Sequence, residues 1–377
     1  MSSVCQQCAL RLQRASQTTT RHLSNRSFSS TTPVSSALPA FVPTRNSEFD
    51  GIIEDLRLKH FFPASLKQNA RKVLYQQKNR QLLEDNPRIV EFGGKQTQYQ
   101  YIERHTEVPN RGDLLRKAVD IIADGGEKEW ANLPVLLQAF HKIIQKPVED
   151  KHIEKLIRKA GVHNKLASFI KCLHMVDRTG LSLKNDTVLE ALLLAIRRRA
   201  STGGFQRIAT TAALKYGTEV ADLLETEEHG TARVLGANDP RTRPQVIGLF
   251  LELVAANVQS TGGKDVDGVV KSYAQKLLGR IKEQPASIET SKIQLQPAGQ
   301  QTQFLFAVSL WHGLQLASKI LGPQMPYADV ARTTLKQYRS VLDKLEKELE
   351  ARQTQPNTYD RMAIDDWKLV KQPSKAA

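Results

Sequence analysis

Residues 150–157 read Asp-Lys-His-Ile-Glu-Lys-Leu-Ile, and residues 186–193 read Asp-Thr-Val-Leu-Glu-Ala-Leu-Leu. The acidic and apolar positions of the first stretch return in the second after 36 residues. Within each stretch the apolar residues recur three or four positions apart, which is the spacing of one face of an amphipathic helix. Another helix is predicted at 164–178, where Thr179-Gly180 ends it. The sequence therefore predicts a two-helix unit that is repeated.

Helical periodicity continues on both sides of this repeat, and glycine or proline interrupts it at short intervals. Many helices joined by short connections predict a mainly α fold of stacked helical hairpins, either an α-solenoid-like array or an irregular bundle. The last of these helices has a heptad seam that favours packing on the body. We expect helices at 111–123, 127–145, 150–161, 163–178, 186–199, 205–224, 241–258, 265–283, 302–321 and 326–352.

The segment between the two copies, Met175-Val-Asp-Arg-Thr-Gly-Leu-Ser-Leu-Lys-Asn-Asp186, resembles the inter-repeat segment of pentatricopeptide proteins. The resemblance covers about 50 residues, and no clean third copy follows. In that family a few side chains per repeat read single RNA bases. One degenerate unit implies a helical-repeat scaffold and not a base code. Two equivalent helices of an ordinary bundle remain open as the other interpretation.

A basic helix and a β-hairpin are predicted before this array. The helix starts near Pro63 and runs to about Leu83, and its apolar residues face away from the basic ones. The segment 88–102 alternates apolar and polar residues around Gly93-Gly94, which predicts a β-hairpin. The helix is a candidate phosphate-binding face or a solvated face. Its candidate RNA-binding residues are Lys67, Arg71, Lys72, Lys78 and Arg80.

Tyr99 and Tyr101 would share one face of the hairpin, because side chains alternate along a strand. They are candidates for stacking on unpaired bases, although aromatic residues at this spacing more often pack on a neighbouring helix. Two further basic clusters lie within the helical array and are either phosphate contacts or solvated surface. They are Lys155, Arg158 and Lys159, and Arg197, Arg198 and Arg199.

The first 32 residues contain four arginines and many serines and threonines, and the first acidic residue of the chain is Glu48. This composition is typical of a mitochondrial transit peptide. The stretch Arg26-Ser-Phe28-Ser-Ser resembles the processing sites of fungal mitochondrial precursors. We therefore expect localisation in the mitochondrial matrix and cleavage between about Phe28 and Pro33.

The formal charge of the chain is +15, from 54 basic and 39 acidic residues. The four leader arginines supply only part of this excess, so the body keeps a charge of +11. Such a field favours a polyanionic partner. No apolar run is long enough to span a bilayer, so no transmembrane segment is expected.

No pattern for catalysis or for a cofactor is found. Gly93-Gly94-Lys95 and Gly262-Gly263-Lys264 lack the other residues of a phosphate loop. Cys5 and Cys8 form a single CxxC pair inside the leader, without a second pair for a metal. We expect no enzyme, no metal, no cofactor and no small-molecule substrate.

These features predict five segments: a transit peptide at 1–32, a flexible arm at 33–49, the basic helix with the β-hairpin at 50–108, the helical-hairpin scaffold at 109–352 and a polar tail at 353–377. Together they resemble a fungal-type mitochondrial ribosomal protein, which implies ribosomal RNA and neighbouring ribosomal proteins as partners. The sequence does not identify the subunit, and we slightly favour the large one. The alternatives are a mitochondrial RNA-binding translational activator or RNA-maturation factor, and a respiratory-complex assembly factor without RNA contact.

Overall fold

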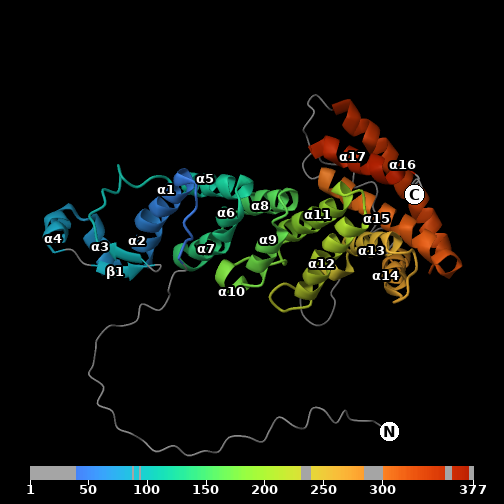
Figure 1. Ribbon diagram of the computed structural model, residues 1–377, viewed down its shortest axis with the longest axis horizontal. Helices are drawn as coiled ribbons and strands as arrows, with labels where there is room; N and C mark the ends of the chain where they lie inside the picture. The colour runs from blue at the N-terminus through green and yellow to red at the C-terminus, as the bar shows by residue number, and fades with distance from the viewer. Residues whose placement is uncertain are drawn as a thin grey trace, which may run out of the picture. The chain divides into compact units, whose positions relative to one another are not determined.

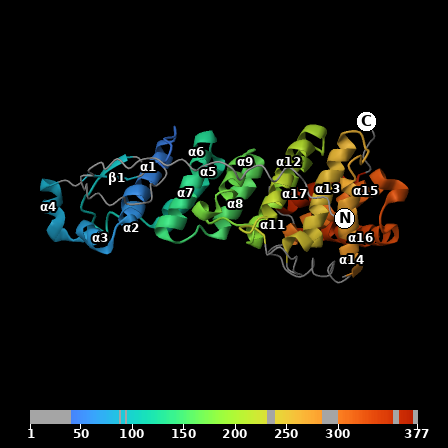
Figure 2. The same cartoon turned by 90° about the horizontal axis from the view of Figure 1, so that it is seen from below.

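The computed structural model describes residues 40–86, 89–92, 95–230, 239–283, 300–352 and 359–372. In these ranges the protein is mainly α-helical, with one two-stranded antiparallel sheet, as predicted (Figure 1 and Figure 2). The predicted leader and its cleavage site, and the first residues of the predicted arm, lie outside the described residues.

Helical hairpins follow one another from Arg111. Their first helices are α5 (Arg111–Asp124), α8 (Asp150–Val162), α11 (Asp186–Thr202) and α13 (Pro244–Ser260). In Figure 1 α5, α8 and α11 lie along the upper edge of this array, and α7, α9, α10 and α12 lie along the lower edge. The second helices are α7 (Leu133–Gln138) with the π-helical turn Ala139–Ile144, α9 (Leu166–Leu173) with α10 (Val176–Thr179), α12 (Arg207–Leu224) and α14 (Val269–Glu283). The short helix α6 (Glu127–Ala131) precedes α7.

The sequence repeat corresponds to equivalent positions in α8 and α11, which pack on each other. Asn185 caps α11 by accepting a hydrogen bond from the Thr187 backbone N–H. Its amide also donates to Asp150 at the start of α8 (2.9 Å), so one side chain aligns the beginnings of both helices. The buried residues of the two helices match after 36 residues: Ile153, Leu156, Ile157 and Ala160 correspond to Leu189, Leu192, Leu193 and Ile196.

Gly180 ends the second helix of this unit, as the sequence predicts. Its φ is +72°, a left-handed conformation that favours glycine, and a Cβ at this position would lie 2.5 Å from the His141 ring. The turn is therefore both left-handed and in close contact with the preceding hairpin.

The C-terminal part adds α15 (Gln300–Leu321), α16 (Ala328–Arg352) and α17 (Tyr359–Lys371). Helices α13 and α15 approach closely through Gly248 and Gly313: a Cβ on Gly313 would lie 2.8 Å from the Glu252 backbone nitrogen. The heptad residues of α16 pack on the body, as expected. By length and composition alone, the helix at residues 301–324 could cross a membrane, so the statement that no apolar run is long enough was too strict. However, 72% of their most apolar window is buried, as in the core helix of a globular protein.

The N-terminal part corrects the long basic helix. It consists of α1 (Ser47–Asp55), a π-helical turn (Leu56–Phe61), α2 (Phe62–Ser65), α3 (Gln68–Tyr75), a 3-10 turn (Gln77–Asn79) and α4 (Arg80–Asp85). Extended backbone at Leu66 and Gln76, with ψ of 146° and 117°, breaks the helix that we predicted to run from Pro63 to Leu83.

The β-hairpin is confirmed, but it is shorter than predicted. Strand β1 (Ile89–Phe92) pairs with β2 (Lys95–Gln98), and Phe92 lies opposite Lys95. The predicted turn residues Gly93-Gly94 lie outside the described residues. The buried Arg57 guanidinium donates to the Phe92 carbonyl and to the Thr97 hydroxyl (2.9 Å), which fixes the hairpin against the π-helical turn.

The predicted arm and the predicted polar tail both contain ordered structure. In the predicted arm, the Val42 N–H donates to the buried Asn132 amide oxygen (2.7 Å), and the Asn132 amide nitrogen donates back to the Val42 carbonyl (2.9 Å). In the predicted polar tail, α17 buries Ala363, Ile364, Trp367 and Val370. The Trp367 ring packs edge-on against Trp311 of α15 at 4.9 Å between centroids. A single tryptophan in a polar segment was too weak a signal for this helix.

Candidate functional site

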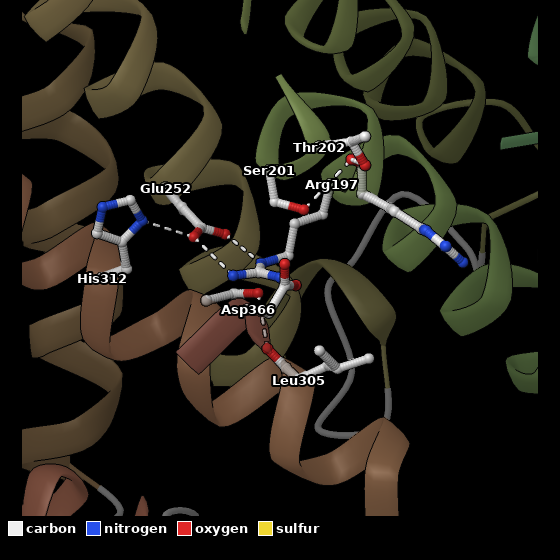
Figure 3. Close-up of polar contacts among 9 residues, drawn as sticks. Arg197, Ser201, Thr202, Glu252, Leu305, His312 and Asp366 are labelled. Atoms are coloured by element: carbon white, nitrogen blue, oxygen red, sulfur yellow. Dashed lines mark hydrogen bonds and ion pairs between the residues drawn. The ribbon is translucent and has the colours of Figure 1, made fainter. Parts of the chain in front are cut away.

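A buried ionic cluster joins four helices at the C-terminal end of α11. Arg197 follows eight mostly apolar residues of that helix, and its side chain is 1% exposed. Its Nε and Nη2 donate to the two Glu252 carboxylate oxygens (2.7 and 3.1 Å), and Nη1 donates to Asp366 of α17. His312 Nδ1 of α15 lies 2.8 Å from the same Glu252 carboxylate (Figure 3). The cluster thus connects α11, α13, α15 and α17.

Electrostatics decides the charge state of this cluster. Burial alone would raise the pKa of the Glu252 carboxyl, but the charge of Arg197 and the hydrogen bond with His312 outweigh burial and hold that pKa below its usual range. The same carboxylates raise the pKa of Arg197 despite its burial. A paired buried charge of this kind fixes how helices pack, and removal of one partner typically costs about 3–5 kcal/mol.

A cavity of about 480 Å³ adjoins the cluster between α8, α11, α15 and α17. Both charge signs line it, including Arg158, Arg198, Glu190 and Asp365. Burial raises the pKa of the Glu190 carboxyl, with a smaller contribution from Asp186.

The described residues hold no group of three His, Cys, Asp or Glu side chains that could bind a metal. Cys172 is fully buried, and desolvation raises the pKa of its thiol to about 12, so it is inert at neutral pH. His174, two residues later in the chain, contacts the Glu219 carboxylate (2.9 Å).

The basic residues predicted to bind RNA in the N-terminal part lie on separate short helices and turns. Lys67, Lys72 and Lys78 are exposed, but they lie before α3, in its last turn and in the 3-10 turn, respectively. Arg71 donates to the carbonyls of Pro63, Ala64 and Leu66 and so caps the end of α2. Arg80 pairs with Glu84 (3.1 Å). Lys67 and Arg71 stay one turn apart, since the Arg71 N–H donates to the Lys67 carbonyl (3.0 Å), but the break at Gln76 separates them from Lys78, so the single continuous basic helix is wrong.

The two tyrosines differ in environment, and strand β2 ends before both of them. The half-buried Tyr99 ring packs edge-on against Phe62 at 5.3 Å, as a core residue does. The Tyr101 hydroxyl donates to Glu103 (2.5 Å), and the Arg80 guanidinium lies 5.9 Å from the Tyr101 ring centroid. Tyr99 thus packs on the neighbouring helix α2, which was the alternative to stacking on RNA bases.

Most cations of the other two predicted clusters have partners. Lys155 and Lys159 form ion pairs with Asp120 (2.6 Å) and Asp124 (2.5 Å) of the preceding hairpin. The remaining contacts are Arg158 with Glu154 (3.7 Å) and Arg199 with Asn164, while Arg198 lines the cavity. The prediction that Arg197 binds RNA is corrected, because its guanidinium is buried between Glu252 and Asp366 and leaves no surface for a phosphate. Sequence reasoning also missed Glu252, His312 and Asp366, and the one available signal was an acid inside the apolar stretch 246–258.

The fold and the site together define a class: a basic protein of stacked helical hairpins whose buried ionic cluster joins four helices. Comparison with known proteins then identifies the family. The sequence model of mitochondrial ribosomal protein mS27 matches residues 26–369. The chain is also 27% identical over 274 residues to the small ribosomal subunit protein mS27 of Neurospora crassa, covering 67% of this chain and 68% of that protein.

The chain therefore belongs to the mitochondrial ribosomal protein mS27 family. This confirms the predicted class, a fungal-type mitochondrial ribosomal protein, and its location in the mitochondrion. The family points to the small ribosomal subunit, so our slight preference for the large subunit is not supported.

Proposed function

We propose that this protein is a non-catalytic structural component of the small subunit of the mitochondrial ribosome, in the matrix, that contacts ribosomal RNA and neighbouring proteins. The observation that carries the proposal is the family match over residues 26–369, which includes nearly all of the described helices. The net positive charge supports an RNA partner. The exposed residues Lys67, Lys72 and Lys78 remain candidate phosphate contacts.

Sedimentation of native mitochondrial ribosomes tests this proposal. At moderate salt, the protein is expected in stoichiometric amounts in the small-subunit fractions, and RNase treatment should release it together with the other subunit proteins. Its recovery only in light fractions would refute a structural role in the ribosome.

A second candidate is an RNA-binding translational activator or RNA-maturation factor. It is favoured by the succession of helical hairpins, because helical-repeat arrays commonly form RNA-binding surfaces. Such a factor would be substoichiometric to the small subunit and would leave it at higher salt. Membership in a ribosomal protein family argues against the assembly-factor alternative.

A further inference from the structure

Cations without ion-pair partners are concentrated on the second helices of the hairpins. Within their bounds the second helices carry nine basic and four acidic residues, whereas the first helices carry ten basic and eight acidic residues. Of the nine, Arg280 pairs with Glu283 (3.8 Å). The other eight form no ion pair with any residue that the structure describes.

The first helices differ because their charges are used inside the protein. Lys155 and Lys159 bridge successive hairpins through Asp120 and Asp124, and Arg197 is buried. A lysine that is already paired with a carboxylate must give up that ion pair to bind a phosphate. Such a lysine therefore neutralises phosphates poorly and displaces few of the counterions condensed on the nucleic acid. The first-helix face is thus less suited to a polyanion than its basic residues suggest.

Each second helix instead presents at least one exposed, unpaired lysine. These are Lys142 in the π-helical turn, Lys171 in α9, Lys215 in α12 and Lys276 in α14. Arg207 lies two turns before Lys215 on the exposed side of α12. Packed helices lie roughly 8–10 Å apart. The second helices that carry Lys142, Lys171 and Lys215 are neighbours in the array, since α7 contacts α9 and α9 contacts α12, whereas α14 with Lys276 packs on α13.

We infer that this row, Lys142, Lys171, Lys215 and Lys276, binds the phosphodiester backbone of RNA without reading its bases. The inference deepens the proposed function and rests on it. Two exposed carboxylates, Asp177 and Asp222, lie on the same second helices and weaken the positive field of the row. A membrane surface fits the row less well, because the second helices expose large apolar side chains only in their first turns, at Ile208 and Val269.

Salt-dependent binding of the full mature chain to in vitro transcribed small-subunit ribosomal RNA tests the row. The variant Lys171→Glu with Lys215→Glu and Lys276→Glu should bind about tenfold or more weakly and lower the slope of log affinity against log salt by roughly 2–3. The matched control is Lys117→Glu with Lys336→Glu and Lys347→Glu. These lysines are exposed and unpaired among the described residues, they lie on α5 and α16, and their reversal changes the net charge equally.

A second variant should bind RNA more tightly, a result that misfolding cannot produce. Asp177→Asn with Asp222→Asn removes the two carboxylates from the row and should tighten RNA binding while thermal unfolding changes little. An equal loss in the Lys171 variant and its control overturns the row, since only net charge would then matter. Undiminished RNA binding by the Lys171 variant also overturns it, but leaves the ribosomal proposal intact.

Failure of the unmodified chain to sediment with the small subunit would instead refute the proposed function. Tight binding to anionic phospholipid vesicles, with none to RNA, would assign the row to a membrane and overturn the inference.

Discussion

At the scale of single residues, the buried charges of Arg197 and Glu252 fix the packing of α11 on α13. Arg197→Met should lower the free energy of unfolding by about 3–5 kcal/mol, because it leaves the Glu252 carboxylate buried without its partner. Arg197→Met combined with Glu252→Gln should cost less than the sum of the single changes, since the second removes the uncompensated charge. Urea unfolding of the four proteins gives the coupling energy. Strict additivity would show that the ion pair does not stabilise the protein in solution.

His229 should make stability depend on pH. Its Nδ1 accepts from the Leu183 N–H (3.1 Å), and its Nε2 lies 3.0 Å from the Leu173 carbonyl, so the folded ring is neutral. Burial lowers its pKa from the usual 6.5, and the hydrogen bond to Leu173 only partly opposes this. The unfolded chain therefore binds the proton first. Stability is full above about pH 6.5 and falls as the pH drops below it, by at most about 1.4 kcal/mol per pH unit.

The replacement His229→Gln should flatten this pH profile, because glutamine keeps a donor and an acceptor but does not titrate in this range. Burial also lowers the pKa of His60 and His152. They act equally in both proteins, so the difference between the two profiles isolates His229. Parallel profiles between pH 8 and 5 would contradict this assignment.

At the scale of helices, the contact between α13 and α15 depends on glycine. An alanine in a helix is normally about 0.8–1 kcal/mol more favourable than a glycine. Gly313→Ala should nevertheless destabilise the protein, since its Cβ would lie 2.8 Å from the Glu252 backbone nitrogen and 3.0 Å from the Gly248 carbonyl. Gly279→Ala in α14 is the control: nothing lies within 4 Å of its Cβ, and it should stabilise. Thermal unfolding that moves in the same direction for both would disprove the close contact.

Helices were predictable from the sequence wherever local periodicity determines them. The 36-residue repeat predicts α8 and α11 with their buried positions, because a helix face is specified within one segment. The break at Leu66 was not predictable, since the Arg71 side chain binds the carbonyl groups of Pro63 and Leu66 there, and helical periodicity does not report such a contact. Partners of Arg197 lie on helices far apart in the chain, and no pattern in a single sequence reports such a contact.

At the scale of the whole described body, the buried apolar residues form two clusters. One extends from Phe49 to Leu253 with Phe306 added, and the other from Ile247 to Val370. They meet at the partly buried Phe205, Leu214 and Tyr273, which pack against both. Stability in stacked helical repeats passes mainly between neighbours, so each cluster is expected to open with some independence.

Hydrogen exchange on two tryptophan variants tests this independence. Trp367 and Trp130 are both 0% exposed, one in each cluster, and replacement of either by alanine should cost about 3–5 kcal/mol. Trp367→Ala should reduce amide protection in α15, α16 and α17 and leave α5 and α8 nearly unchanged, because it removes the contact with Trp311. Trp130→Ala should give the opposite pattern. If both variants lower protection uniformly along the chain, the two clusters unfold as one cooperative unit.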